Sequence, residues 1–284
     1  MEEKGEEKPK RAGRIALIVF IALYLFVFAL YCVIDLGMSF AHLWTPWRPD
    51  YARADITAIL EKTELTDEDY ETLQLQTGLT RLGVDGILAA GDEERILDLQ
   101  EHYFADYEVT DYMFAPFLCR EVIPVNIPLA ELEDGDILVS PTAHFSGFRF
   151  GHAVMVLGGD TGTIIASEGY GRKSGLFSLA AFTNRPSFVV LRYKDRELAE
   201  KVARYAESEL LGIDYSLTVG VIEPKNPDTL TRTQCAHIIW YAYNHFGVDL
   251  DASGGVVVSP MDLATSPELE LVQSYGIEPG KRWR

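Results

Sequence analysis

The sequence predicts an α+β fold in which an antiparallel sheet packs on helices, preceded by an apolar N-terminal helix and a small helical region. Two observations lead to this prediction. From Ile127 onward, short apolar runs are broken by Gly, Pro and Asp, a pattern typical of strands and turns. Residues 15–34 form an uncharged run of about twenty residues, the length at which a helix crosses a bilayer core. The 284 residues leave room for one main core besides these segments.

The chain is strongly acidic. It contains 43 Asp and Glu residues against 25 Lys and Arg, a formal net charge of -18. A surface of this sign repels phosphate backbones and anionic headgroups. We therefore expect no nucleic-acid partner, and we interpret most of the charge as solvated surface.

Residues 15–35 are expected to be a single transmembrane helix that follows a cytoplasmic tail, residues 1–14. The alternatives are a cleavable signal peptide, which has a shorter apolar stretch, and a buried core helix. Lys and Arg gather on the cytoplasmic side of membrane helices. Arg48 and Arg53 are the nearest basic residues after the helix. Five basic residues precede it: Lys4, Lys8, Lys10, Arg11 and Arg14. The N-terminus should therefore lie inside the cytoplasmic membrane and the rest of the chain outside.

Residues 44–124 are expected to form a helical accessory region. Thr66 has the position of an N-cap, with Asp69 three residues later, and Asp92 precedes a second stretch with helical spacing. No chemistry-bearing pattern stands out here, so the region's acidic residues are interpreted as a solvated face.

Residues 125–284 are expected to form the main domain. Four runs are predicted to be strands: 136–140, 152–157, 163–168 and 187–193. Asp195 is expected to cap a helix over residues 196–211. A second helix is expected over residues 234–246, with Thr233 as its N-cap and Gly247 as its left-handed stop.

Cys235 is the candidate nucleophile. In the first turn of the second helix it would lie among unpaired backbone N–H groups, which together with the helix dipole favour the thiolate. At roughly 100° per residue, Cys235 shares a face with Ile238, Ile239 and Ala242, so the thiol points at whatever the helix packs against.

The base that activates the thiol must come from another element. On the same helix, His237 points away, and His245 lies about 15 Å down the axis. Two further histidines fall in other regions, His42 beside the membrane helix and His102 in the accessory region. His144 in a loop and His152 at the head of a strand remain.

Glu168 is the candidate orienting acid for His152. If Leu157 pairs with Thr163 across a tight loop, the antiparallel register places His152 opposite Glu168, with Cβ atoms about 5 Å apart. A register shifted by one residue would place Gly169 or Ser167 there instead.

Cys119 and Cys235 are the cysteines outside the membrane helix, and a disulfide between them is the alternative to a reactive thiol. No Cys-x-x-Cys or His-x-x-x-His spacing favours zinc. We expect neither a metal nor a cofactor.

Two segments carry a resemblance to a known family. They read GDILVSPTAHFSGFRFGHAVMVLG, from Gly135, and TQCAHIIWYAYNHFGVDLDASGGVVVSPMDLATSP, from Thr233. Together they resemble the circularly permuted papain-like amidases of the NlpC superfamily, the YiiX-like group. In that family the His strand precedes the Cys helix, as here. The resemblance covers residues 127–267, and the chain departs from the family pattern at Ala236, where a small hydroxyl residue is common.

The resemblance implies a papain-like, circularly permuted domain with His152 as base, Glu168 as third polar member and Cys235 as nucleophile. It implies that Asp136 opens the first strand near the substrate. The segment LLGIDYSLTV resembles the family's glycine and tyrosine element, which makes Tyr215 a candidate for lining the site.

The expected function is thiol-dependent amide cleavage outside the membrane, with an acyl-enzyme at Cys235 and the oxyanion held partly by its backbone N–H. The family and the compartment suggest cell-wall peptide as substrate. One alternative is a thiol-dependent lipid acyl hydrolase or acyltransferase, which the membrane anchor would suit. The other is an inactive binding module with a Cys119–Cys235 disulfide.

Overall fold

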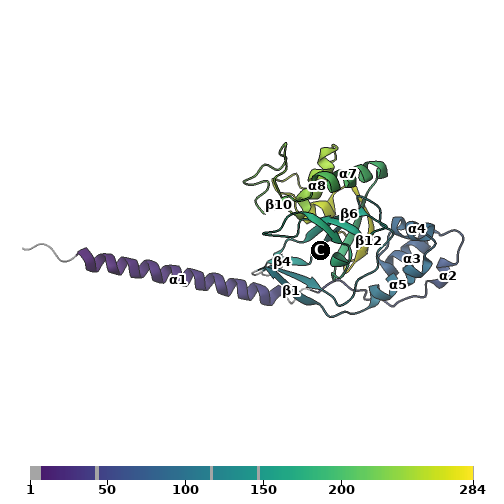
Figure 1. Ribbon diagram of the computed structural model, residues 1–284. Coiled ribbons are helices and arrows are strands. Elements are labelled where there is room, and N and C mark those ends of the chain that lie inside the picture. Colours follow the sequence, from purple (N-terminus) through teal and green to yellow (C-terminus); the bar gives the residue numbers. More distant parts are fainter. Residues whose placement is uncertain (1–7, 42–44, 116–117, 146–147, 284) are drawn as a thin grey trace, which may run out of the picture. The chain divides into compact units, whose positions relative to one another are not determined.

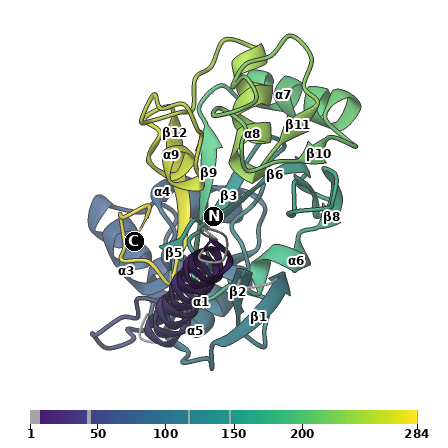
Figure 2. The same cartoon turned by 90° about the vertical axis from the view of Figure 1, so that its left-hand side faces the viewer.

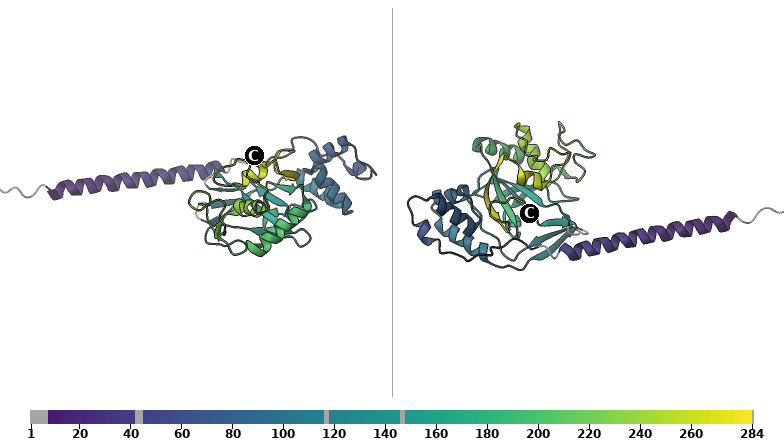
Figure 3. Two further views of the ribbon diagram at one scale, coloured as in Figure 1. Left: turned by 90° about the horizontal axis from the view of Figure 1, so that it is seen from above. Right: turned by 180° about the vertical axis from the view of Figure 1, so that it is seen from behind.

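The computed structural model describes residues 8–41, 45–115, 118–145 and 148–283, and it divides into two units. The first unit contains helix α1 (Lys8–Ala41), an uninterrupted helix in Figure 3. Its stretch Gly13–Leu36 is long and apolar enough to cross a membrane, and none of that stretch is buried. The predicted apolar N-terminal helix is therefore confirmed. Residues 1–7 of the expected cytoplasmic tail, as well as His42 and residue 44 at the start of the accessory region, lie outside the described residues.

A six-stranded antiparallel sheet forms the centre of the second unit, in the order β12-β9-β3-β6-β7-β8. Its strands are β3 (Ile137–Ser140), β6 (His152–Gly158), β7 (Thr163–Ala166), β8 (Gly175–Ser178), β9 (Phe188–Tyr193) and β12 (Leu269–Tyr275). The four predicted strands are all present, and the α+β class is confirmed. The two strands that the sequence did not reveal, β8 and β12, lie at the sheet's edges.

Helices cover both faces of this sheet. Alternate residues of β3 enter different cores: Ile137 and Val139 pack with α7 (Arg196–Glu209), α8 (Cys235–His245) and α9 (Pro260–Thr265), whereas Leu138 packs into the core of the opposite face. That second core is built with α3 (Asp67–Thr77), α4 (Arg81–Ala89) and α5 (Glu93–Phe104). Figures 1 and 2 show α7 and α8 on one side and α3 to α5 on the other.

The predicted accessory region is therefore one layer of the main body. It also contains α2 (Thr57–Leu60), and the predicted caps are confirmed: Thr66 and Asp69 form a capping box on α3, and Asp92 caps α5. The prediction that the region is helical as far as residue 124 was wrong. Strands β1 (Thr110–Ala115) and β2 (Leu118–Val122) belong to a second sheet with β4 (Ala143–Phe145) and β5 (Phe148–Arg149).

The two predicted helices of the main domain are present, with one corrected cap. Asp195 caps α7, accepting a hydrogen bond from Leu198 N at 3.1 Å. The N-cap of α8 is Gln234 rather than Thr233, because the Gln234 side chain accepts from Ala236 N while the Thr233 hydroxyl bonds the His237 ring. Gly247 follows α8 with φ +83°, the predicted left-handed stop.

Candidate active site

Cys235 is the first residue of α8, and its thiol is held in place from the N-cap. The Gln234 side-chain oxygen accepts from the thiol at 3.5 Å and from Ala236 N at 2.8 Å, while its amide nitrogen donates to the Val258 carbonyl. Only 6% of Cys235 is exposed. The thiol therefore lies where α8 meets the sheet, at the end of the helix that favours an anion.

His152 is the first residue of β6, paired with Ser140 of β3. Helix α8 packs on β6 (Figure 1), and the first residues of the two elements, Cys235 and His152, act on each other. The His152 imidazole and the Cys235 thiol lie close enough for each to shift the pKa of the other. The ring of His152 also stacks on that of Phe182, with centroids 6.3 Å apart.

Glu168 lies 3.3 Å from His152, measured from Oε1 to Nε2. The predicted register holds along the strands, where Met155 pairs with Ile165 and Val156 with Ile164. At the turn it does not, because Gly158 rather than Leu157 pairs with Thr163. Since β7 ends at Ala166, Glu168 reaches His152 from beyond the ladder. The ring faces the carboxylate through Nε2.

The three groups shift one another's pKa toward an ion pair. Burial disfavours the Cys235 thiolate, but the hydrogen bond and charge of His152 outweigh it and lower the thiol pKa. Burial also lowers the pKa of His152, yet hydrogen bonds to Cys235 and Glu168 raise it overall. For Glu168, burial raises the pKa, and His152, Arg185 and Arg120 bring it down to about 2. The site therefore favours thiolate, imidazolium and carboxylate together.

Tyr215 lies close to these groups, and Asp136 does not. Tyr215, in β10 (Asp214–Tyr215), pairs with Thr233 of β11 (Arg232–Thr233), directly before the Cys235 helix. Burial raises its pKa, and the charges of Cys235 and Glu168 raise it further.

Asp136 lies four residues from Ser140 along β3, about 13 Å at 3.3 Å per residue. It is fully buried and accepts two hydrogen bonds from Arg192, at 2.9 and 2.7 Å. The expectation that Asp136 lies near the substrate is not supported by this position. Its carboxylate is part of a buried ion pair that ties β3 to β9.

The remaining described histidines have other partners. His237 contacts the Lys225 carbonyl at 2.7 Å and the Thr233 hydroxyl at 3.0 Å, and burial lowers its pKa. His245 stacks on Tyr205, with centroids 4.1 Å apart. His102 contacts the Tyr107 hydroxyl at 2.6 Å.

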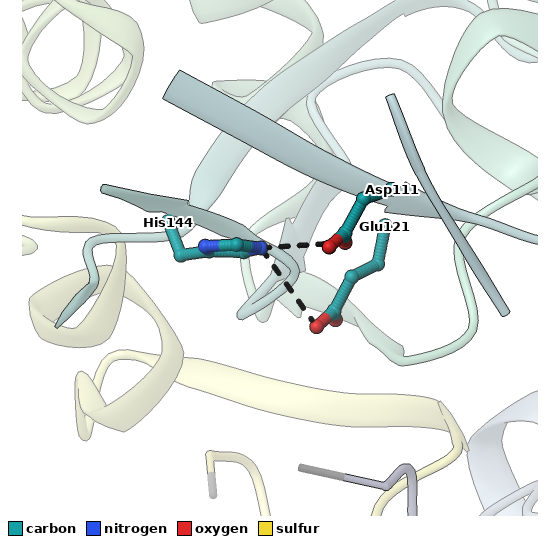
Figure 4. Close-up of side chains that lie close together, drawn as sticks. All are labelled: Asp111, Glu121 and His144. Carbon is teal, nitrogen blue, oxygen red and sulfur yellow. Dashed lines mark hydrogen bonds and ion pairs between the residues drawn. The ribbon is translucent and has the colours of Figure 1, made fainter. Parts of the chain in front are cut away.

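His144, the other candidate base, lies instead in a separate polar cluster with Asp111 and Glu121. Figure 4 shows its ring directed at the two carboxylates, with Nε2 3.5 Å from Asp111 Oδ1 and 4.0 Å from Glu121 Oε1. The three ligand atoms lie within 4.8 Å of one another, a spacing that could hold a metal ion. Arg149, however, donates to both carboxylate oxygens of Glu121 and already neutralises it. The residues come from three strands, so no sequence spacing reveals them.

Two arginines near the triad of Cys235, His152 and Glu168 were also missed by sequence reasoning. Arg120 Nη1 lies 4.0 Å from Glu168 Oε2. Arg185 is 2% exposed and lies over the Phe182 ring, 4.6 Å from its centroid. Neither residue stands in a motif, and each reaches the site only through the folded chain.

All three cysteines lie in described parts of the chain, and all three are free. The Cys119–Cys235 disulfide of the binding-module alternative is therefore absent.

Comparisons of the chain with models of protein families, with curated proteins and with solved structures found no match.

Proposed function

We propose that this chain is a membrane-anchored cysteine amidase or peptidase in which Cys235 is the nucleophile and His152 the general base. One observation carries the proposal: the His152 imidazole lies 3.3 Å from the Glu168 carboxylate and close enough to Cys235, at the start of a helix, for the two groups to shift each other's pKa. This is the nucleophile, base and orienter arrangement of covalent hydrolases.

The chemistry follows from these positions. The Cys235 thiolate attacks the carbonyl carbon, and backbone N–H groups of the first turn of α8 stabilise the negative charge that develops on the oxygen. The His152 imidazolium donates its proton to the departing amine, which leaves the acyl group on sulfur. His152 then takes a proton from water, which attacks the thioester and frees the acid. Glu168 fixes the ring orientation and stabilises the imidazolium throughout.

The proposal includes a papain-like, circularly permuted fold and an extracytoplasmic site. The first is supported by the chain order, since the histidine strand β6 precedes the cysteine helix α8. The second is supported by the basic residues that precede the apolar helix. Cell-wall peptide is the proposed substrate, by analogy with the resembled family and from the external placement.

A lipid-directed acyl hydrolase or acyltransferase is the second candidate. It is favoured by the apolar helix in the same chain, which would keep the enzyme at a lipid surface. The same thiolate attack would then open an ester or amide of a lipid. Release of fatty acid from vesicles, set against release of amine from a peptide, separates the two candidates.

The test is the pH dependence of iodoacetamide labelling at Cys235, measured by mass spectrometry on the full chain in detergent. The expected labelling proceeds well below the free-thiol pKa of about 8.5. In His152→Ala the labelling midpoint should rise above that of the wild type, because the imidazolium no longer stabilises the thiolate.

His245→Ala is the matched control, since this exposed histidine lies at the far end of the same helix. Its labelling profile should match the wild type. A Cys235 that titrates like a free thiol, with or without His152, would contradict the proposal.

A further inference from the structure

The surroundings of the triad are positively charged, although the whole chain carries a formal charge of -18. With thiolate and imidazolium formed, Cys235 and Glu168 contribute two negative charges. His152, Arg120 and Arg185 contribute three positive ones. These five groups together therefore carry one positive charge in excess.

Arg185 is the clearest case of a charge without a partner. It is 2% exposed, and within the described chain no carboxylate lies within ion-pair distance of it. Nη1 donates to the Thr142 hydroxyl at 3.3 Å, while Nε is buried without a hydrogen-bond partner. A buried charge is costly unless it is paired and hydrogen-bonded, and Arg185 meets neither condition fully. Burial lowers the pKa of Arg185 to about 9, and the charges of Glu168 and Cys235 oppose that shift.

Arg120 is the member of the pair that solvent can reach. Its side chain is 22% exposed, and its guanidinium carbon lies 5.5 Å from the centre of the Tyr112 ring. Its ion pair with Glu168 spans 4.0 Å, too long for a hydrogen bond, and its Nε is buried without one. The N–H donors of the Arg120 guanidinium are therefore not all used in hydrogen bonds. This guanidinium lies next to Glu168, the acid that orients His152.

We propose that Arg120, with the buried charge of Arg185 close by, binds a carboxylate of the peptide substrate close to the scissile amide. This inference rests on the proposed function and names the substrate class. Arginine presents donors in a planar fork that matches a carboxylate, and a single carboxylate supplies the one missing negative charge. Arg120 pairs with the Glu168 carboxylate, which contacts the His152 imidazole beside the thiol. A carboxylate two or three residues from the cleaved bond is therefore within reach at about 3.8 Å per residue. A strongly acidic surface disfavours an anionic membrane as the source of that charge.

The first test compares alkylation of Cys235 by iodoacetate, which carries a carboxylate, and by iodoacetamide, its neutral counterpart. The full chain is used in detergent, and the readout is the ratio of the two rate constants. Because both reagents need the thiolate, a change in thiol pKa cancels in this ratio. We expect a ratio above that of glutathione, falling about three- to tenfold in Arg120→Gln.

Two variants make the result specific. Arg204→Gln removes an equal charge from the exposed face of α7 and should leave the ratio unchanged. Arg120→Lys keeps the charge and should keep most of the ratio. If the ratio is the same in Arg120→Gln as in the wild type, the proposal is overturned. The ratio can be measured even if Cys235 proves to be a slow, unactivated thiol, so this outcome is distinct from a failure of the proposed function.

The second test measures protection of Cys235 from iodoacetamide by N-acetyl-alanyl-alanine and by its C-terminal amide. The acid should protect at a concentration at least fivefold lower than the amide, and Arg120→Lys, which lacks the fork, should lose much of this difference. Vesicles of phosphatidylglycerol are compared with vesicles of phosphatidylcholine. Equal protection by acid and amide, or selective protection by the anionic vesicles, would overturn the assignment to a peptide carboxylate.

Discussion

The Nε2 atom of His152 lies 3.3 Å from Oε1 of Glu168, although the pairing of β7 with β6 stops at Ile165, three residues before Glu168. The backbone hydrogen bonds between β6 and β7 therefore do not position the carboxylate; the chain that follows β7 brings it to the ring. This places the acid on Nε2 of an imidazole whose pKa Cys235 also raises.

Glu168→Gln should weaken the thiolate–imidazolium pair without abolishing it. The pKa of His152 is raised in part by Glu168, so removing the negative charge lowers that pKa and makes the ion pair less stable. We expect the labelling midpoint of Cys235 to rise by about half a unit to one unit, less than in His152→Ala. Glu200→Gln, an exposed neutralisation on α7, is the control. An unchanged midpoint in Glu168→Gln would mean that the acid does not act on the ring.

The same carboxylate should contribute to stability in a defined pH range. Its pKa is lowered from 4.5 to about 2 in the folded chain. A depressed acid stabilises the fold above its unfolded pKa, and that contribution disappears as pH falls through the folded pKa. The difference in melting temperature between wild type and Glu168→Gln should therefore be largest above pH 5 and shrink toward pH 2. A constant difference over this range would contradict the shift.

Arg185→Met should make the protein more stable and less reactive. Replacing a buried, unpaired charge by an apolar side chain of similar length removes a desolvation cost, for which we expect a gain of about 1–3 kcal/mol. The loss of positive charge should also raise the thiol pKa of Cys235, because the two charges attract. Differential scanning fluorimetry and the labelling profile measure the two effects. A large drop in melting temperature would show that Arg185 stabilises the fold.

Asp136→Asn should lower stability and leave the thiol unchanged. The carboxylate is fully buried on Arg192, and removing it leaves that charge with the partly exposed Glu133. We expect a loss of about 2–4 kcal/mol in the free energy of unfolding. The labelling midpoint of Cys235 should stay that of the wild type below the melting transition. Asp160→Asn, on an exposed turn, is the control. A shifted labelling midpoint would restore Asp136 to the site.

Membrane topology can be read from one exposed cysteine. Glu278→Cys, introduced after the three native cysteines are changed to Ser, places a thiol on the surface of the second unit. If the basic residues before the apolar helix set the orientation, intact cells should label this position with a membrane-impermeant maleimide. Labelling that requires permeabilised cells would place the second unit inside.

The sequence alone determined the elements that have strong local signals. The apolar run before Leu36 had the length and composition of a long helix, and the capping pattern at Thr66 marked the start of α3. Short apolar runs broken by Gly, Pro and Asp marked four central strands. The start of α8 and its cysteine followed from similar signals. Periodicity was less informative for β8 and β12, which lie at the sheet's edges, and for the strands of the second sheet.

The tertiary structure alone decided what surrounds the thiol. The sequence predicted a contact between His152 and Glu168 from an assumed turn between two strands. In the fold the contact exists, but Glu168 lies beyond the paired part of the strands, so the strand register does not determine it. It placed Asp136 in a buried ion pair, and it brought Arg120 and Arg185 from separate elements close enough to Glu168 to lower its pKa. Electrostatic interactions depend on distance and burial, which spacing along the chain does not encode. The residues of the site could thus be predicted one at a time, but their charge balance could not.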